Sequence, residues 1–345
     1  MFGRKLATQT ASPAPTPTPA ERTAAPARSA LGLAGAALLF LAAAAALLAA
    51  RGNPYDGAPV VRVRVSGPLA AAPAASAKGA AIPTEIGALE AAPIAGLTAP
   101  GPGGLLPIIA ADGRASWKAY ARPFNDDGRP KIALVIGGLG LNAEAAHAAI
   151  SSLPPEVTLA FSPYAEGLQG LIDAARAAGH EVMVEMPMEP LDYPDTDPGP
   201  YTLVANTQPV EITHRMEWLL SRGTGYFGVI NSFGGRFLSQ EKPMQAFAQV
   251  LRQRGLAFID DGQGAGRGGD LRRASAAVRI DGDLDSAAID NQLLALEAQA
   301  LQKGGAVGVG SGYPLTVTQV QAWATAVRDR GYALAPASAL MTSRP

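Results

Sequence analysis

The sequence predicts an α/β fold in which parallel strands alternate with helices, and three observations support it. About eight short runs of aliphatic and β-branched residues lie between Lys131 and the C-terminus. Nearly every run is followed by a helix-like stretch. The runs stop at glycine-rich or polar clusters, as Lys131–Ile136 stops at Gly137-Gly138-Leu139-Gly140. Strands alternating with helices are typical of a parallel sheet, and the chemistry of such folds lies where the strands end.

The individual elements follow from local signals. After the first strand we expect strands at Val157–Phe161, Glu181–Glu185, Phe227–Ile230, Ala257–Ile259, Ala277–Ile280, Ala306–Val309 and Ala333–Ala335. The helices expected between them are Asn142–Ser151, Leu168–Ala178, Pro209–Ser221, Pro243–Arg254, Ser286–Gln302 and Thr318–Arg330. An N-capping asparagine, first-turn prolines and the helix-ending Gly179 support these boundaries.

Two architectures fit this alternation, an open doubly wound sheet and a closed barrel. The number of strands, with helices between nearly all neighbours, favours a distorted (β/α) barrel of seven to eight strands. The glycines at 137, 138 and 140 lack the spacing of a dinucleotide-binding loop, which argues against the open form.

The N-terminal part is expected to lie outside this fold. Residues 1–29 are rich in Ala, Thr and Pro and are predicted to be a disordered cytoplasmic tail. Residues 30–50 form an uncharged apolar run that would span about 30 Å as a helix, so we expect a transmembrane anchor. A cleaved signal peptide is the alternative, but its apolar stretch is usually shorter, about 7 to 15 residues.

Basic residues before the anchor favour a single pass through the inner membrane, with the C-terminal domain in the periplasm. Residues 51–128 are rich in Ala, Pro and Gly and are expected to be a linker, followed by the folded domain at 129–341. A formal net charge of −1 gives no basic field for nucleic acid, which excludes that class of partner. The chain has no cysteine, so cysteine spacing gives no information about a zinc ribbon or a thiol nucleophile.

Polar side chains gather at or just beyond the predicted strand ends. Glu189, Asp260 and Asp261 are the candidate catalytic residues, since paired carboxylates can act as acid and base. The alternative is that they only hold loop backbone and pair with arginines. The candidate substrate-binding residues are Tyr164, Asn231 and Arg236, and a loop aromatic such as Tyr164 can stack on a sugar ring. Glu185 and Asp281 also lie at this rim.

Short motifs in one order along residues 131–338 resemble a known family. They include Lys131–Gly140, Leu153-Pro154-Pro155-Glu156, Gly179-His180-Glu181-Val182, Met186-Pro187-Met188-Glu189-Pro190 and Gly228-Val229-Ile230-Asn231. The segment resembles the divergent polysaccharide deacetylases of bacterial envelopes, relatives of NodB-type carbohydrate esterases. The resemblance implies a distorted barrel, a role in carbohydrate metabolism and a cell-envelope glycan as partner.

The positions at which the resemblance implies catalytic groups carry other residues here. Gly137 and Gly138 stand where two aspartates would hold the metal and act as base, and Ser232 and Ser311 stand where histidines would be expected. The three histidines, His147, His180 and His214, fall on separate elements. We therefore expect no bound transition metal and no cofactor, although carboxylates could hold a divalent cation such as Mg²⁺ or Ca²⁺.

Three hypotheses follow from the sequence. The first is a membrane-anchored envelope pseudoenzyme that has lost the standard metal-dependent hydrolysis and binds glycan. The second is an active glycan deacetylase that uses a rearranged carboxylate site around Glu189, Asp260 and Asp261. The third is a non-catalytic scaffold of the envelope.

Overall fold

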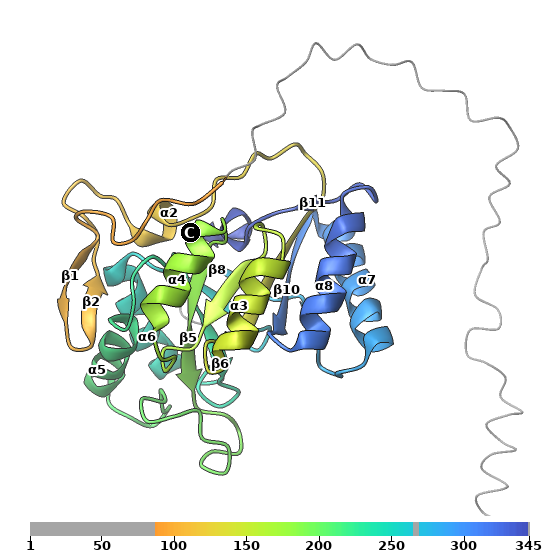
Figure 1. The fold of residues 1–345 in the computed structure, drawn as a ribbon. Coiled ribbons are helices and arrows are strands. Elements are labelled where there is room, and N and C mark those ends of the chain that lie inside the picture. The colour runs from red at the N-terminus through yellow and green to blue at the C-terminus, as the bar shows by residue number, and fades with distance from the viewer. Residues whose placement is uncertain (1–86, 265–268, 344–345) are drawn as a thin grey trace, which may run out of the picture. The chain divides into compact units, whose positions relative to one another are not determined.

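The structure, a computed structural model, describes residues 87–264 and 269–343 (Figure 1). The predicted tail, the membrane anchor and residues 51–86 of the predicted linker lie outside the described residues. Among the helices that are described, none combines the length and the apolar character needed to cross a bilayer.

The core of the domain is a curled, mostly parallel sheet of ten strands. The path runs β12-β8-β7-β6-β5-β4-β3-β10-β9, and β11 pairs separately with β3. The strands are β3 (Lys131–Leu139), β4 (Thr158–Phe161), β5 (Val182–Met188), β6 (Gly228–Phe233), β7 (Ala257–Asp260), β8 (Arg272–Ser275), β9 (Val278–Arg279), β10 (Gly305–Ser311), β11 (Ala333–Leu334) and β12 (Thr342–Ser343). All pairs are parallel except β12 with β8. The predicted strands are confirmed, whereas β8 and β12 were not expected.

The two sides of the sheet approach each other through one short segment. β8 pairs with β7 and β9 pairs with β10, and only Ala276 and Ala277 separate the two strands. The Ala276 N–H donates to the Asp260 carbonyl at 2.8 Å, while the Ala277 N–H donates to the Val307 carbonyl at 2.7 Å. The sheet therefore curls like a barrel. Its two edges are joined through the single segment Ala276-Ala277 and not by a continuous ladder of paired strands.

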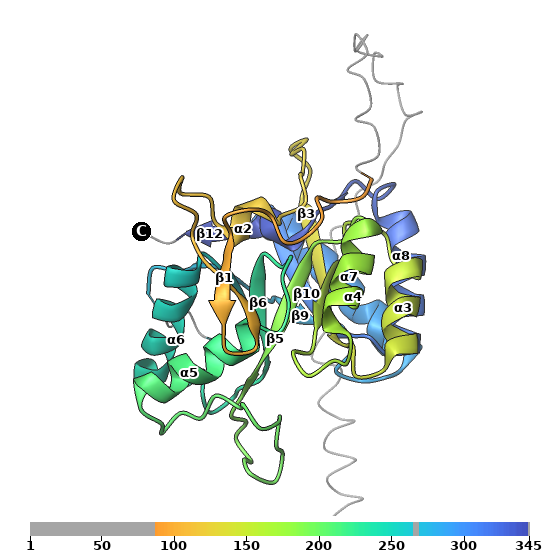
Figure 2. The same cartoon turned by 60° about the vertical axis from the view of Figure 1, so that its left-hand side comes forward.

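Six helices follow the strands: α3 (Ala143–Ser152), α4 (Leu168–Ala177), α5 (Pro209–Leu220), α6 (Glu241–Arg254), α7 (Ser286–Lys303) and α8 (Pro314–Val327). Their ends follow the predicted signals. Asn142 caps α3 by accepting from the Ala145 N–H, α5 and α8 begin with a proline, and α6 ends at Gly255 with φ +62. In Figure 2, α5 and α6 lie to one side of the strands and α3, α4, α7 and α8 to the other.

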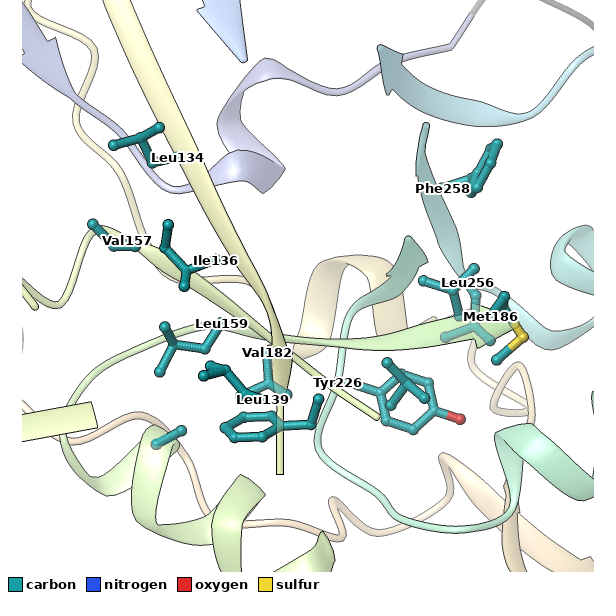
Figure 3. Close-up of a cluster of buried hydrophobic side chains, with 14 of the residues drawn as sticks. Leu134, Ile136, Leu139, Val157, Leu159, Val182, Met186, Tyr226, Leu256 and Phe258 are labelled. Carbon is teal, nitrogen blue, oxygen red and sulfur yellow. The ribbon is translucent and has the colours of Figure 1, made fainter. Parts of the chain in front are cut away.

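Alternation along the strands divides the apolar residues into two cores. On β3, Ile132, Leu134 and Ile136 belong to the outer core beneath the helices, and Ala133 and Val135 belong to the inner core of the sheet. Successive side chains of a strand point to opposite faces, which explains the division. Figure 3 shows part of the outer core.

Residues before β3 complete the inner core. β1 (Thr98–Gly101) and β2 (Gly104–Pro107) form a hairpin, and α2 (Ser116–Ala119) follows. Leu97 and Tyr120 are buried among the inner-core residues. The folded part thus includes residues 87–128, which the sequence had placed in the linker. Their apolar side chains alternate with Pro and Gly in no helix or strand period, and several of them pack against the inner face of the sheet.

Candidate functional site

Four strands place residues on the inner face at the carboxyl end of the sheet. The inner core contains Val135 on β3, Met183 on β5, Ile259 on β7 and Val309 on β10. Because side chains alternate between the two faces of a strand, the residues two positions later are on the same inner face. These residues are Gly137, Glu185, Asp261 and Ser311. Gly137 and Ser311 are register partners across β3 and β10. This end of the inner face is therefore polar, above a layer of apolar residues.

The Glu185 carboxylate lies against the backbone of β3. Its Oε1 accepts a hydrogen bond from the Gly138 N–H at 2.6 Å. A Cβ atom on Gly137 would lie 2.6 Å from the same oxygen, so Glu185 fills the space that a side chain at position 137 would need. Gly138 has φ +68, a conformation that glycine adopts without strain.

Burial raises the pKa of the Glu185 carboxyl group from 4.5 to about 7, and the Gly138 hydrogen bond and the Arg279 charge act in the opposite direction. A carboxyl group with a pKa in this range exchanges a proton near neutral pH. The charge of Glu185 is therefore expected to change near neutral pH.

Asp261 lies on the same face and is held by two neighbouring strands. Its Oδ2 pairs with Arg279 of β9 at 3.2 Å and accepts from Gln263 at 2.9 Å. Its backbone N–H donates to Asn231 Oδ1 of β6 at 2.9 Å, and Asn231 Nδ2 donates to the Phe233 carbonyl at 2.5 Å. Arg279, whose side chain is 45% exposed, therefore lies beside Asp261 and acts electrostatically on Glu185.

Asp281 supports the neighbouring end of β10. Its Oδ2 accepts from the Ser311 N–H at 2.6 Å and from the Thr316 hydroxyl at 3.2 Å. These bonds fix the turn that leads from β10 into α8.

Asp260 lies on the other face of β7 from Asp261. It is fully buried, forms an ion pair with Arg273 of β8 and accepts from the Ser275 hydroxyl at 2.6 Å. The N–H groups of Gly262 and Gly264 also donate to it, at 3.1 and 3.2 Å. All these partners belong to the segment that follows β7, so the contacts of Asp260 hold that segment in place.

Glu189 and Arg236 join the loops that follow β5 and β6. Glu189 is 4% exposed; its Oε2 accepts from the Ala205 N–H at 2.6 Å, and its Oε1 pairs with Arg236 Nε at 3.3 Å. The Arg236 N–H donates to the Glu189 carbonyl at 3.1 Å. The structure thus brings Glu189 together with Arg236, and Asp261 with Asn231, while Asp260 has a separate set of partners.

Tyr164 supports the long loop after β5. Its hydroxyl accepts from the Tyr201 N–H at 3.0 Å, and the Tyr201 ring stacks on Trp218 with centroids 3.8 Å apart. The Tyr164 ring is also packed against Gly199, where an added Cβ would lie 2.6 Å from it. These contacts give Tyr164 a packing role beside its predicted role in binding sugar.

Comparison with known proteins shows the family to which the domain belongs. Residues 134–341 match the family described as divergent polysaccharide deacetylase. The chain belongs to this family. A crystal structure of an uncharacterized protein from Agrobacterium tumefaciens is 34% identical, covers 69% of this chain and 99% of its own, and has a TM-score of 0.65.

Two curated proteins also match this chain. An uncharacterized protein of Haemophilus influenzae is 23% identical over 200 residues, which cover 56% of this chain and 70% of the relative. The uncharacterized protein YibQ of Escherichia coli is 23% identical over 198 residues, covering 55% of this chain and 61% of YibQ.

The residues of this chain do not fit the metal that the resemblance implies. Among residues 87–264 and 269–343, no three His, Cys, Asp or Glu side chains are grouped so that they could hold an ion. His180 is buried, with its ring nitrogens 2.8 Å from the Val157 carbonyl and 3.1 Å from the Ile150 carbonyl, and His147 and His214 are exposed on α3 and α5. The Glu185 carboxylate also fills the space beside Gly137.

Sequence reasoning placed Glu185 at the rim but did not select it over Glu189 and Asp260. The alternation of side chains between the two faces of each strand could have identified Glu185. Glu185 shares a strand face with Met183, and Gly137 shares one with Ala133 and Val135. Assigning the small apolar residues to the inner face would have placed Glu185 opposite the two glycines.

Proposed function

We propose that this protein is a membrane-anchored envelope protein whose domain binds glycan without the standard metal-dependent hydrolysis of deacetylases. The observation that carries the proposal is the contact of Glu185 with Gly137 and Gly138. A carboxylate from a neighbouring strand fills the space where the resemblance implies a metal-binding aspartate.

Several features support glycan as the ligand. Membership of the polysaccharide deacetylase family points to carbohydrate. The inner face at the carboxyl end offers a carboxyl group, a guanidinium group and a serine hydroxyl, the hydrogen-bonding partners that sugar hydroxyls require. The apolar run at residues 30–50 supports anchoring in the inner membrane with the domain in the periplasm.

The test uses the full chain and measures three quantities: bound metal by elemental analysis, acetate release from N-acetylglucosamine oligomers, and binding of oligosaccharides and peptidoglycan fragments by calorimetry. The expected result is binding of at least one glycan without stoichiometric zinc and without acetate release. Stoichiometric zinc together with acetate release would refute the loss of hydrolysis, and no binding to any glycan would refute the recognition role.

A rearranged carboxylate site for deacetylation is the second candidate function, and the raised pKa of Glu185 favours it. A group with a pKa of about 7 is suited to acid–base chemistry at neutral pH. Glu185→Gln should then abolish acetate release while leaving the fold intact, and release that persists in this variant would exclude Glu185 as the acid or base.

A further inference from the structure

Large apolar side chains are exposed around the carboxyl end of the sheet. Leu141, Leu191, Phe233, Leu284 and Tyr313 are 73%, 77%, 51%, 54% and 49% exposed. They lie at the end of β6 or in the segments that follow β3, β5, β9 and β10. Because these strands are parallel, all five residues lie at the same end of the sheet. We call these five residues the apolar rim.

The Phe233 ring is held in the rim by its backbone. Phe233 has φ +58, and among the residues that the structure describes it is the one non-glycine residue with positive φ. Its carbonyl accepts the hydrogen bond from Asn231 Nδ2, and Asn231 also accepts from the Asp261 N–H. The position of the Phe233 ring therefore depends on the hydrogen bonds that Asn231 forms with Phe233 and Asp261.

The apolar rim lies at the same end of the sheet as the polar site already described. Glu185, Asp261 and Arg279 lie on the inner face, and the rim residues follow the same set of strands. A ligand that covers both must combine apolar surfaces with many hydrogen-bonding groups. A sugar chain has this combination, since its rings offer C–H faces and its hydroxyls form hydrogen bonds.

The charged residues around the apolar rim indicate which kind of sugar this site would bind. Exposed acidic residues are frequent in the segments between and around the rim residues: Glu144, Glu166, Asp192, Asp195, Asp283 and Asp285. Exposed basic residues are fewer in the described part of these segments, and two of them, Arg236 and Arg279, are paired with Glu189 and Asp261. The field at this end attracts cationic ligands and opposes sugars that carry carboxylate or phosphate.

We infer that the apolar rim and the polar site inside it bind oligosaccharides that carry free amino groups, with Phe233 as the principal stacking residue. The inference rests on the proposed function, because it names the kind of glycan bound at the same site. The protein would thereby recognise a glycan from which acetyl groups have already been removed.

The experiment compares two probes of equal length, a glucosamine hexamer and an N-acetylglucosamine hexamer, by calorimetry on the full chain at low and high salt. At low salt the glucosamine hexamer should bind at least about tenfold more tightly, and the difference should shrink as salt screens the acidic residues. The double variant Asp195→Asn/Asp283→Asn should weaken only the glucosamine hexamer. The matched control is Asp329→Asn, an exposed carboxylate that follows α8 at the opposite end of the domain.

Stacking is tested separately. Phe233→Ala should weaken both hexamers by at least about fivefold, whereas Leu301→Ala, which removes an even more exposed apolar side chain on α7, should change neither. Equal or tighter binding of the N-acetylated hexamer at low salt would overturn the amino-sugar inference and leave the proposed glycan binding standing. If neither hexamer nor any peptidoglycan fragment binds, both proposals fail.

Discussion

The Glu185 carboxylate and the backbone of Gly137 are fitted to one another: an added Cβ at Gly137 would lie 2.6 Å from Glu185 Oε1. The same oxygen accepts the Gly138 N–H. Position 137 therefore has room for a carboxylate that reaches it from β5 or for a side chain of its own, but not for both.

Gly137→Ala is expected to displace the Glu185 carboxylate from the Gly138 N–H and to reduce the free energy of unfolding by about 1–2 kcal/mol. Urea denaturation measures the change. In a Glu185→Ala background the same substitution should cost much less, and a cost that stays the same would disprove the contact. Gly170→Ala on α4, where an added Cβ meets nothing within 4 Å, should stabilise by about 0.5–1 kcal/mol.

Glu185→Gln is expected to change how stability depends on pH. The folded-state pKa of about 7 lies above the ordinary 4.5, so the stabilisation from the protonated form is complete below pH 4.5 and is lost as pH rises through 7. The loss amounts to about 3 kcal/mol at pH 8, and the variant should lack it. The difference in free energy of unfolding between wild type and variant, measured from pH 4.5 to 8, tests this.

Asp260→Ala is expected to destabilise the domain by about 3–5 kcal/mol, because it leaves the Arg273 guanidinium without its buried carboxylate. Thermal or urea unfolding measures the loss. The exposed pair of Asp112 with Arg114 provides the comparison, and Asp112→Ala should lower the free energy of unfolding far less than Asp260→Ala does. A fully stable Asp260→Ala variant that has lost glycan binding would instead assign Asp260 to the ligand site.

Phe233→Gly is expected to separate stability from binding. Glycine adopts φ +58 without the steric cost of about 1 kcal/mol that an L side chain meets there, so the variant should be as stable as the wild type or slightly more so. It should nevertheless bind oligosaccharide more weakly, because the exposed ring is lost. Denaturation and calorimetry on the same preparation test both statements, and unchanged binding would remove Phe233 from the site.

The sequence alone determined the alternation of strands and helices, and with it the end of the sheet at which polar residues gather. Apolar runs such as Ala306–Val309 and capping residues such as Asn142 are local signals, so β10 and α3 could be predicted within a few residues. The motifs also predicted the family, which the match over residues 134–341 confirms.

Only the tertiary structure decided which partner each carboxylate has. Asp260 and Asp261 are adjacent in sequence, yet alternation and the contacts of β8 and β9 direct one to Arg273 and the other to Arg279. It also ordered Leu97 and Tyr120 in a segment without periodicity, and it brought Glu185 to Gly137 across the sheet. Such contacts depend on the curvature and register of strands far apart in the chain, which local propensity does not encode.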